Sequence, residues 1–162
     1  MAAGCRNRWG THLISHFPVP TKKVVTLNAE HPVLPSDLFV RCPLALKQVE
    51  AHLFVLALGR LSKHSQRLTF QLTFGDVLPE VNADDQFARL DKAHKRLMQP
   101  LKYEGLRLGN RFSHSIPLFT EMSIDQDPGL MTGVFNYYLR QHLLDLATEY
   151  TPAQLKSLLM RR

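Results

Sequence analysis

Hydrophobic residues recur at helical spacing after residue 43. Leu46, Val49 and Leu53 follow one another at intervals of three or four residues, and neighbouring apolar positions widen this stripe. Such a period is typical of a helix, and a helix that is apolar around most of its circumference is usually buried. The pattern therefore predicts a central helix from about Leu44 to Leu61, with Pro43 in its first turn.

A strand is predicted next, because "RLTFQLTF" (residues 67–74) alternates apolar and polar residues. A period of two is typical of a half-buried strand. Gly75 ends this strand, and residues 76–81 predict one short helix with Asp76 as its cap. A turn at Asn82 and Ala83 follows.

An amphipathic helix is predicted from "DDQFARLDKAHKRLMQPL", in which Asp84 or Asp85 serves as the cap and Pro100 bends or stops the helix. Its apolar face holds Phe87, Leu90, His94, Leu97, Met98 and Leu101, with His94 as a partly buried, hydrogen-bonded histidine. The opposite face holds Arg89, Lys92, Arg96 and Gln99, with Lys95 beside them.

Strand patterns return at "EGLRL" and at "FSHSIPLFTEMSI", which "DQDPG" connects to a further strand, "LMTGVFNYY". The end of the chain is helical, and Thr151, Pro152 and Gln154 form a capping-box sequence. This order predicts an α+β fold, a winged helix-turn-helix with a β-hairpin wing and flanking helices, over residues 43–162. Residues 1–42 are proline-rich and predict a partly extended N-terminal arm with a short strand at 24–27.

The basic helix indicates a partner for this fold. In a helix-turn-helix the second helix enters the major groove of DNA. The formal net charge of +6 and the isoelectric point of about 9.6 also favour an acidic partner. We therefore expect the apolar face to pack on the central helix. The side chains expected to contact double-stranded DNA are Arg89, Lys92, Lys95, Arg96 and Gln99. The simpler alternative is a solvated helix face stabilised by pairs of opposite charge.

No motif for catalysis is present, since the chain lacks a glycine-rich phosphate loop, GxSxG and HExxH. His12 and His16 have no companion at metal-ligand spacing. We therefore expect no enzyme, no cofactor and no metal. Cys5 and Cys42 fit no disulfide framework, which favours a reducing, cytoplasmic compartment. The longest apolar stretch, residues 51–61, is too short to span a membrane.

Four segments together resemble the first winged-helix domain of the initiator replication proteins of iteron-type plasmids. They are "LPSDLFVRCPLALKQVEAHLFVLALGRL", "FARLDKAHKRLMQPL", "PLFTEMSIDQDPGLMTGVFNYYLRQHLLDL" and "YTPAQLKSLL". The resemblance covers about residues 24–162. It implies a protein that binds repeated sequences of a plasmid origin, helps to open the duplex and recruits a host replication initiator and helicase. It also implies a homodimer that represses its own synthesis.

The same resemblance implies a second winged helix, which reads the repeat sequence in the major groove and would begin where this chain ends, at Arg162. We therefore expect this chain to be a first-domain fragment or a truncated gene product. Its contacts with DNA would be made mainly with the backbone. One alternative is an interaction module that dimerises and titrates a full-length initiator. Its interface would use the hairpin residues Phe119, Met122, Ile124, Phe135, Tyr137 and Tyr138. A simpler interpretation for most of these residues is a sheet face that packs on its own helices. A second alternative is a winged-helix transcription repressor.

Overall fold

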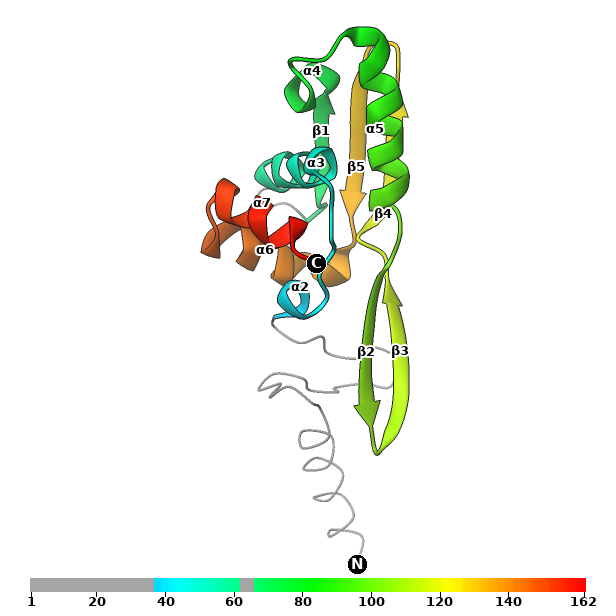
Figure 1. The fold of residues 1–162 in the computed structure, drawn as a ribbon, viewed down its shortest axis with the longest axis vertical. Coiled ribbons are helices and arrows are strands. Elements are labelled where there is room, and N and C mark those ends of the chain that lie inside the picture. Colours follow the sequence, from blue (N-terminus) through cyan, green and yellow to red (C-terminus); the bar gives the residue numbers. More distant parts are fainter. Residues whose placement is uncertain (1–36, 62–65) are drawn as a thin grey trace, which may run out of the picture. The chain divides into compact units, whose positions relative to one another are not determined.

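A computed structural model describes residues 37–61 and 66–162. The chain divides into two compact units (Figure 1). One combines the described residues up to Cys42 with Lys102–Ile116, and the other combines Pro43–Leu101 with Pro117–Arg162. The strand expected at 24–27 lies outside the described residues. None of the helices within the described ranges has the length and apolar character needed to cross a membrane.

The central helix α3 spans Gln48–Gly59 and contacts α4, α5, α6, α7 and β1, so its predicted central place is confirmed. It begins four residues later than predicted, and Pro43 is not in its first turn. The reason is a turn in the backbone, where Ala45 adopts a φ of 50°. The N–H of Leu46 then donates to the carbonyl of Leu159 at 2.9 Å, which ties this turn to α7.

An antiparallel sheet of three strands forms one side of the second unit. It comprises β1 (Thr69–Thr73), β4 (Phe119–Asp125) and β5 (Leu130–Phe135), in the order β1–β5–β4. The alternation predicted for residues 67–74 is confirmed, since Phe70 and Leu72 are buried and their neighbours are exposed. Four buried rings meet on the inner side of the sheet at centroid distances of 4.5–6.2 Å: Phe54, Phe70, Phe119 and Phe135.

The short helix α4 spans Phe74–Val77, and the amphipathic helix α5 spans Ala83–Leu97. Asp76 is not the cap of α4; Thr73 is, because its hydroxyl accepts from the N–H of Asp76 at 3.1 Å. The cap of α5 is Asn82, while Asp84 and Asp85 lie in its first turn, where they complement the helix dipole.

Helix α5 ends at Leu97, ahead of Pro100, as that proline predicts. Its apolar face is therefore shorter than expected. Met98 is exposed beyond the helix, and Leu101 is the first residue of a strand.

Two hairpins follow α5 where the sequence predicted one. The expected strand "FSHSIPLFTEMSI" is divided at Pro117 into β3 (Asn110–Ile116) and β4, which belong to different sheets. Strand β3 pairs with β2 (Leu101–Arg107) through a turn in which Leu108 and Gly109 have φ values of 52° and 79°. Positive φ at both positions is the geometry of a two-residue type I′ turn.

Two C-terminal helices complete the second unit, α6 (Arg140–Glu149) and α7 (Pro152–Met160). The capping box predicted for α7 is confirmed: Gln154 N–H donates to the Thr151 hydroxyl at 3.3 Å, and Thr151 N–H donates to the Gln154 side chain at 3.0 Å. The strand predicted through Tyr138 ends at Phe135, since Tyr137–Leu139 forms a 3₁₀ helix, η1.

Candidate nucleic-acid interface

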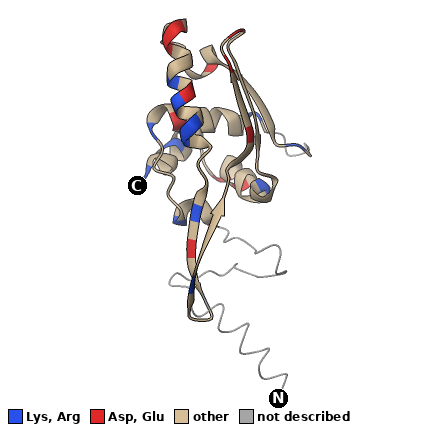
Figure 2. Ribbon diagram, turned by 90° about the vertical axis from the view of Figure 1, so that its right-hand side faces the viewer, with Lys and Arg blue, Asp and Glu red and all other residues tan. Residues whose placement is uncertain are grey.

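Four cationic side chains project into solvent from α5. We name them the α5 basic surface: Arg89, Lys92, Lys95 and Arg96, all of which are exposed. Gln99 is also exposed but lies beyond the end of the helix. The structure thus gathers four of the five predicted residues on one helix, where basic and acidic bands follow one another (Figure 2).

The opposite side of α5 fixes the orientation of this surface. Leu90, Ala93 and Leu97 are buried, and the helix packs against α3 and β4. This arrangement confirms that the apolar face of α5 meets the central helix. Because three positions separated by three or four residues are buried, the cations at intervening positions must face outward.

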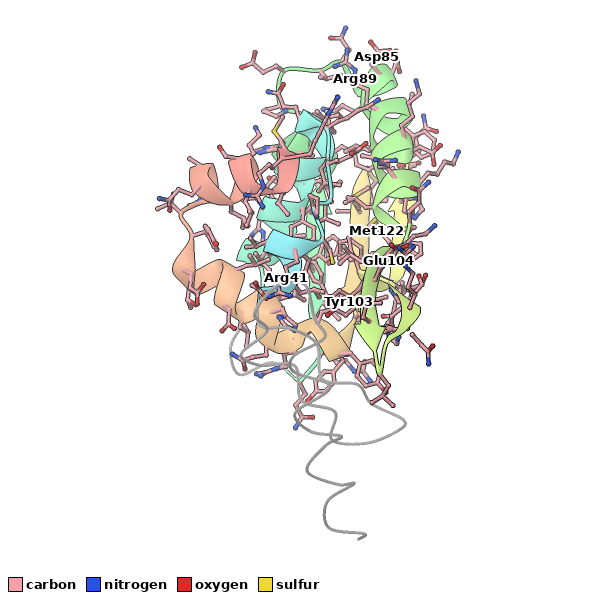
Figure 3. All side chains as sticks on the ribbon, turned by 60° about the horizontal axis from the view of Figure 1, so that its bottom comes forward. Arg41, Asp85, Arg89, Tyr103, Glu104 and Met122 are labelled. Carbon is pink, nitrogen blue, oxygen red and sulfur yellow. The ribbon has the colours of Figure 1, made fainter. Side chains whose placement is uncertain are left out.

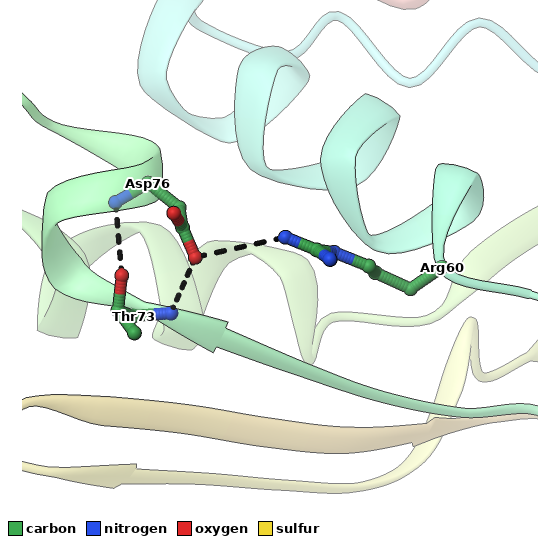
Figure 4. A network of polar contacts seen from close by, with 3 residues as sticks. All are labelled: Arg60, Thr73 and Asp76. Carbon is green, nitrogen blue, oxygen red and sulfur yellow. Dashed lines mark hydrogen bonds and ion pairs between the residues drawn. The ribbon is translucent and has the colours of Figure 1, made fainter.

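A polar network secures the short helix that precedes α5 (Figure 4). The carboxylate of Asp76 accepts from the backbone N–H of Thr73 at 3.0 Å and lies 3.7 Å from the guanidinium of Arg60, at the end of α3. Hydrogen bonds from Thr73, together with the charge of Arg60, lower the pKa of Asp76. The contact joins the end of α3 to the start of α4 across exposed polar groups.

Two further contacts hold the turn between α4 and α5. The side-chain amide of Gln86 donates to the carbonyl of Leu78 at 2.8 Å. The ring centroids of Phe74 and Phe87 lie 6.3 Å apart. The start of α5 is therefore fixed to α4 by one hydrogen bond and one aromatic contact.

Carboxylates reduce the charge of α5. Asp84, Asp85 and Asp91 accompany the four cations, so the helix has a net charge of +1 with histidine neutral. Lys95 donates to Asp91 at 2.7 Å, and the Lys95 side chain is 74% exposed. An exposed pair of this kind contributes about 0.2–1 kcal/mol, so a phosphate can displace Asp91 at low cost.

Asp85 and Arg89 lie near the same end of α5, one turn apart (Figure 3). Arg89 is thus the α5 cation closest to the acidic start of the helix. The other three cations occur in the second half of α5. The cationic character of α5 therefore increases towards its C-terminal end.

His94 is half-buried on the inner side of α5, as predicted, but the expected hydrogen bonding is not seen at one of its ring nitrogens. Its buried Nδ1 has no hydrogen-bond partner among the residues that the structure describes. The same described part of the chain contains no group of three or more histidine, cysteine or acidic residues that could hold a metal ion.

Polar groups also gather in the other unit, around Tyr103 on β2. Asp37 accepts from Arg41 at 2.7 Å, and burial raises the pKa of Tyr103 and of the free thiol Cys42. A buried thiol with a raised pKa is a poor nucleophile. This cluster therefore provides no reactive centre.

An open depression of about 470 Å³ lies on the three-stranded sheet. Its lining includes Arg60 and Glu121 together with hydroxyl and amide side chains. One cation and one carboxylate in a depression this open do not form a catalytic arrangement.

Half of the hairpin surface considered for self-association is internal. Phe119, Met122 and Phe135 are buried, whereas Tyr137 and Tyr138 are exposed. Three of the six residues therefore pack within their own unit, as the simpler interpretation of the sequence predicted, while Ile124 is half-buried and the two tyrosines face solvent.

Comparisons with known proteins identify a family and a similar structure for this chain. Residues 33–160 match the family model described as "Initiator Replication protein, WH1". The structure is similar to the X-ray crystal structure of the MSBI1.176 WH1 domain, a replication protein isolated from a multiple sclerosis patient. The TM-score is 0.51 at 12% sequence identity, covering 78% of this chain and 95% of that chain. No curated protein matches. The predicted winged-helix fold is confirmed.

Proposed function

Because the chain belongs to the initiator replication protein family through its WH1 domain, we propose that it takes part in plasmid replication initiation by binding double-stranded origin DNA. The contact would be made mainly with phosphates, through the α5 basic surface. The observation that carries this proposal is the set of four exposed cations on the second principal helix of a helix-turn-helix. Such contacts set affinity and position but transmit little sequence information.

The distribution of charge along α5 supports phosphate contacts over base contacts. Recognition helices usually insert their N-terminal residues towards base edges. In α5 that end carries the exposed carboxylates of Asp84 and Asp85, which would be repelled by the phosphates lining the groove. The cations begin one turn later, at Arg89. A helix of this kind is better suited to lie along the DNA backbone with its C-terminal half.

The proposal is tested by the salt dependence of duplex binding. Each neutralised phosphate contributes about −0.9 to the slope of log affinity against log salt, so three to four contacts give a slope of roughly −2.7 to −3.6. Affinity for a random duplex should then fall about 40- to 150-fold between 50 and 200 mM salt.

A matched pair of triple variants separates a specific surface from overall charge. Replacing Arg89, Lys92 and Arg96 with alanine removes three cations from α5. Replacing Lys47, Arg111 and Arg162 with alanine removes three exposed cations elsewhere. Only the first variant should lose about one unit of slope per lost contact. Equal losses in both variants would show that duplex binding depends on net charge alone.

Two remaining parts of this function come from the family resemblance and rest on it alone, a homodimer and contacts with a host initiator and helicase. A cytoplasmic location is also part of the proposal and is supported by the two cysteines that fit no disulfide framework. An N-terminal arm over residues 1–42 before a winged-helix domain over 43–162 also belongs to the proposal. No catalytic step, metal or cofactor is assigned. Titration of a full-length initiator is the second candidate, but its expected interface is reduced to Ile124, Tyr137 and Tyr138 by the burial of the other hairpin residues.

A further inference from the structure

The open depression on the three-stranded sheet lies on the face opposite the aromatic core. Its lining includes three exposed polar side chains, those of Thr69, Gln71 and Thr132, which alternate along their strands with the buried Phe70 and Gly133. Its volume of about 470 Å³ falls within the range of roughly 300–1,000 Å³ that is usual for small-molecule sites. The size and the polar lining therefore suit a small polar molecule.

Two charged side chains line this depression from different sides of the sheet. Arg60 reaches it from the end of α3, beside β1, and Glu121 reaches it from β4. The strand order β1–β5–β4 places one strand between β1 and β4, which are therefore roughly 10 Å apart. A ligand that contacts both charges must extend across β5, with a negative group at one end and hydrogen-bond donors at the other.

Both charged groups can bind a further partner. The guanidinium of Arg60 lies 3.7 Å from the carboxylate of Asp76, which is beyond hydrogen-bond distance, and a guanidinium has five N–H donors in a planar fork. Arg60 can therefore keep Asp76 as its ion-pair partner and donate to an anionic oxygen as well. Of the residues that the structure describes, none forms a hydrogen bond or an ion pair with the side chain of Glu121 or of Gln71.

Glu121 and Gln71 together complement one edge of guanine. Gln71 is paired with Thr132 on β5, and Glu121 is paired with Val134, so both flank the same short span of that strand. Guanine presents two adjacent donors, N1–H and the 2-amino group, beside the acceptor O6. A carboxylate can accept from both donors, and a side-chain amide can donate to O6. Adenine instead has an acceptor at N1, which a carboxylate repels.

We propose that the depression binds a guanine mononucleotide, with the base between Glu121 and Gln71 and the phosphate at Arg60. The hydroxyl of Thr132, on the strand between the two charges, is available to the ribose. One cation suits a ligand with one phosphate. The site lies on the sheet face opposite the aromatic core and does not depend on the DNA contact proposed for the α5 basic surface.

The test is isothermal titration calorimetry with guanosine monophosphate, adenosine monophosphate and guanosine. Guanosine monophosphate should saturate the protein with a Kd below about 1 mM, and adenosine monophosphate should bind at least about 10-fold more weakly. Glu121→Gln keeps the size of the side chain but removes its charge. It should weaken guanosine monophosphate about 10- to 100-fold without weakening adenosine monophosphate. Arg60→Gln should weaken both nucleotides and leave guanosine, which has no phosphate, unaffected.

The matched control is Asp125→Asn, which removes one exposed carboxylate from β4 outside the lining of the depression. It should bind guanosine monophosphate as the parent does, and so should the Arg89/Lys92/Arg96 alanine variant. Glu121 is exposed, so Glu121→Gln should keep the circular dichroism spectrum of the parent. The proposal is wrong if guanosine monophosphate does not saturate the protein, if both nucleotides bind equally, or if Glu121→Gln and Asp125→Asn have the same effect.

Discussion

Gly133 on β5 lies directly against the ring of its cross-strand partner, Phe70 on β1: a Cβ atom at Gly133 would be 2.6 Å from two ring carbons of Phe70. Contacts that short do not occur between real side chains, so the ring must move. Phe70 contacts Phe119 and Phe135, which limits its movement. The absence of a side chain at Gly133 therefore allows the aromatic core to pack against the sheet.

Gly133→Ala should destabilise the protein by about 1–3 kcal/mol, the usual cost of overpacking a core. The matched control is Gly59→Ala, because a Cβ at Gly59 meets no atom within 4 Å. That change should be neutral, or stabilising by less than about 1 kcal/mol, because alanine is the better helix former. Chemical denaturation of both variants checks the difference. Equal stability of the two would contradict the close packing of Phe70 on Gly133.

The sequence revealed those parts of the fold in which periodicity is strong. The alternation of Phe70 and Leu72 and the helical spacing of Leu90 and Leu97 follow from burial on one side, which local pattern records directly. The late start of α3 could not be predicted from the sequence. It depends on the positive φ of Ala45, and an alanine does not indicate a positive φ.

Relationships over longer distances in the chain were also missed. The ion pair of Arg60 with Asp76 joins residues from two helices, and no local spacing predicts it. The division of one apparent strand at Pro117 depends on which partner strand each half finds. In contrast, the pairing of Lys95 with Asp91 is local, and its four-residue spacing could have revealed it.

Core leucines of α3 and α5 should be sensitive to truncation. Leu53 and Leu97 are both fully buried, so replacing either with alanine should cost about 2–5 kcal/mol through lost contacts and a residual cavity. Met98→Ala, one residue past α5 and exposed, should cost less than about 0.5 kcal/mol. Urea unfolding curves provide the measurement. A small loss at Leu97 would contradict the assigned phase of α5.

The polar network of Figure 4 should make stability depend on pH in a defined direction. The pKa of Asp76 is lowered from 3.8 in the folded state, so its stabilising contribution is complete above that value and is lost as pH falls through the lower folded pKa. Asp76→Asn should therefore lower the thermal midpoint by a constant amount from about pH 7 to pH 5, and by a shrinking amount towards about pH 3. A difference that grows on acidification would contradict the hydrogen bonds from Thr73.

The ion pair on α5 should restrain one of the proposed DNA contacts. Asp91→Asn removes the partner of Lys95 and should make duplex binding tighter, with a salt slope steeper by up to about one unit. Stability should change by less than about 1 kcal/mol, as for other exposed pairs. Asp145→Asn on α6 makes the same change of charge away from α5 and should leave the slope unaltered. Identical behaviour of the two variants would show that Lys95 makes no separate contact.

The slope of duplex affinity against salt concentration in the Arg89/Lys92/Arg96 alanine variant decides whether α5 meets DNA. A labelled random duplex is titrated at several salt concentrations between about 50 and 200 mM. The slope of log affinity against log salt should be smaller in magnitude than that of the parent by about 2.7, which corresponds to the loss of roughly three phosphate contacts. The Lys47/Arg111/Arg162 variant should keep the slope of the parent. A triple α5 variant with an unchanged slope would contradict the assignment of the α5 basic surface to DNA.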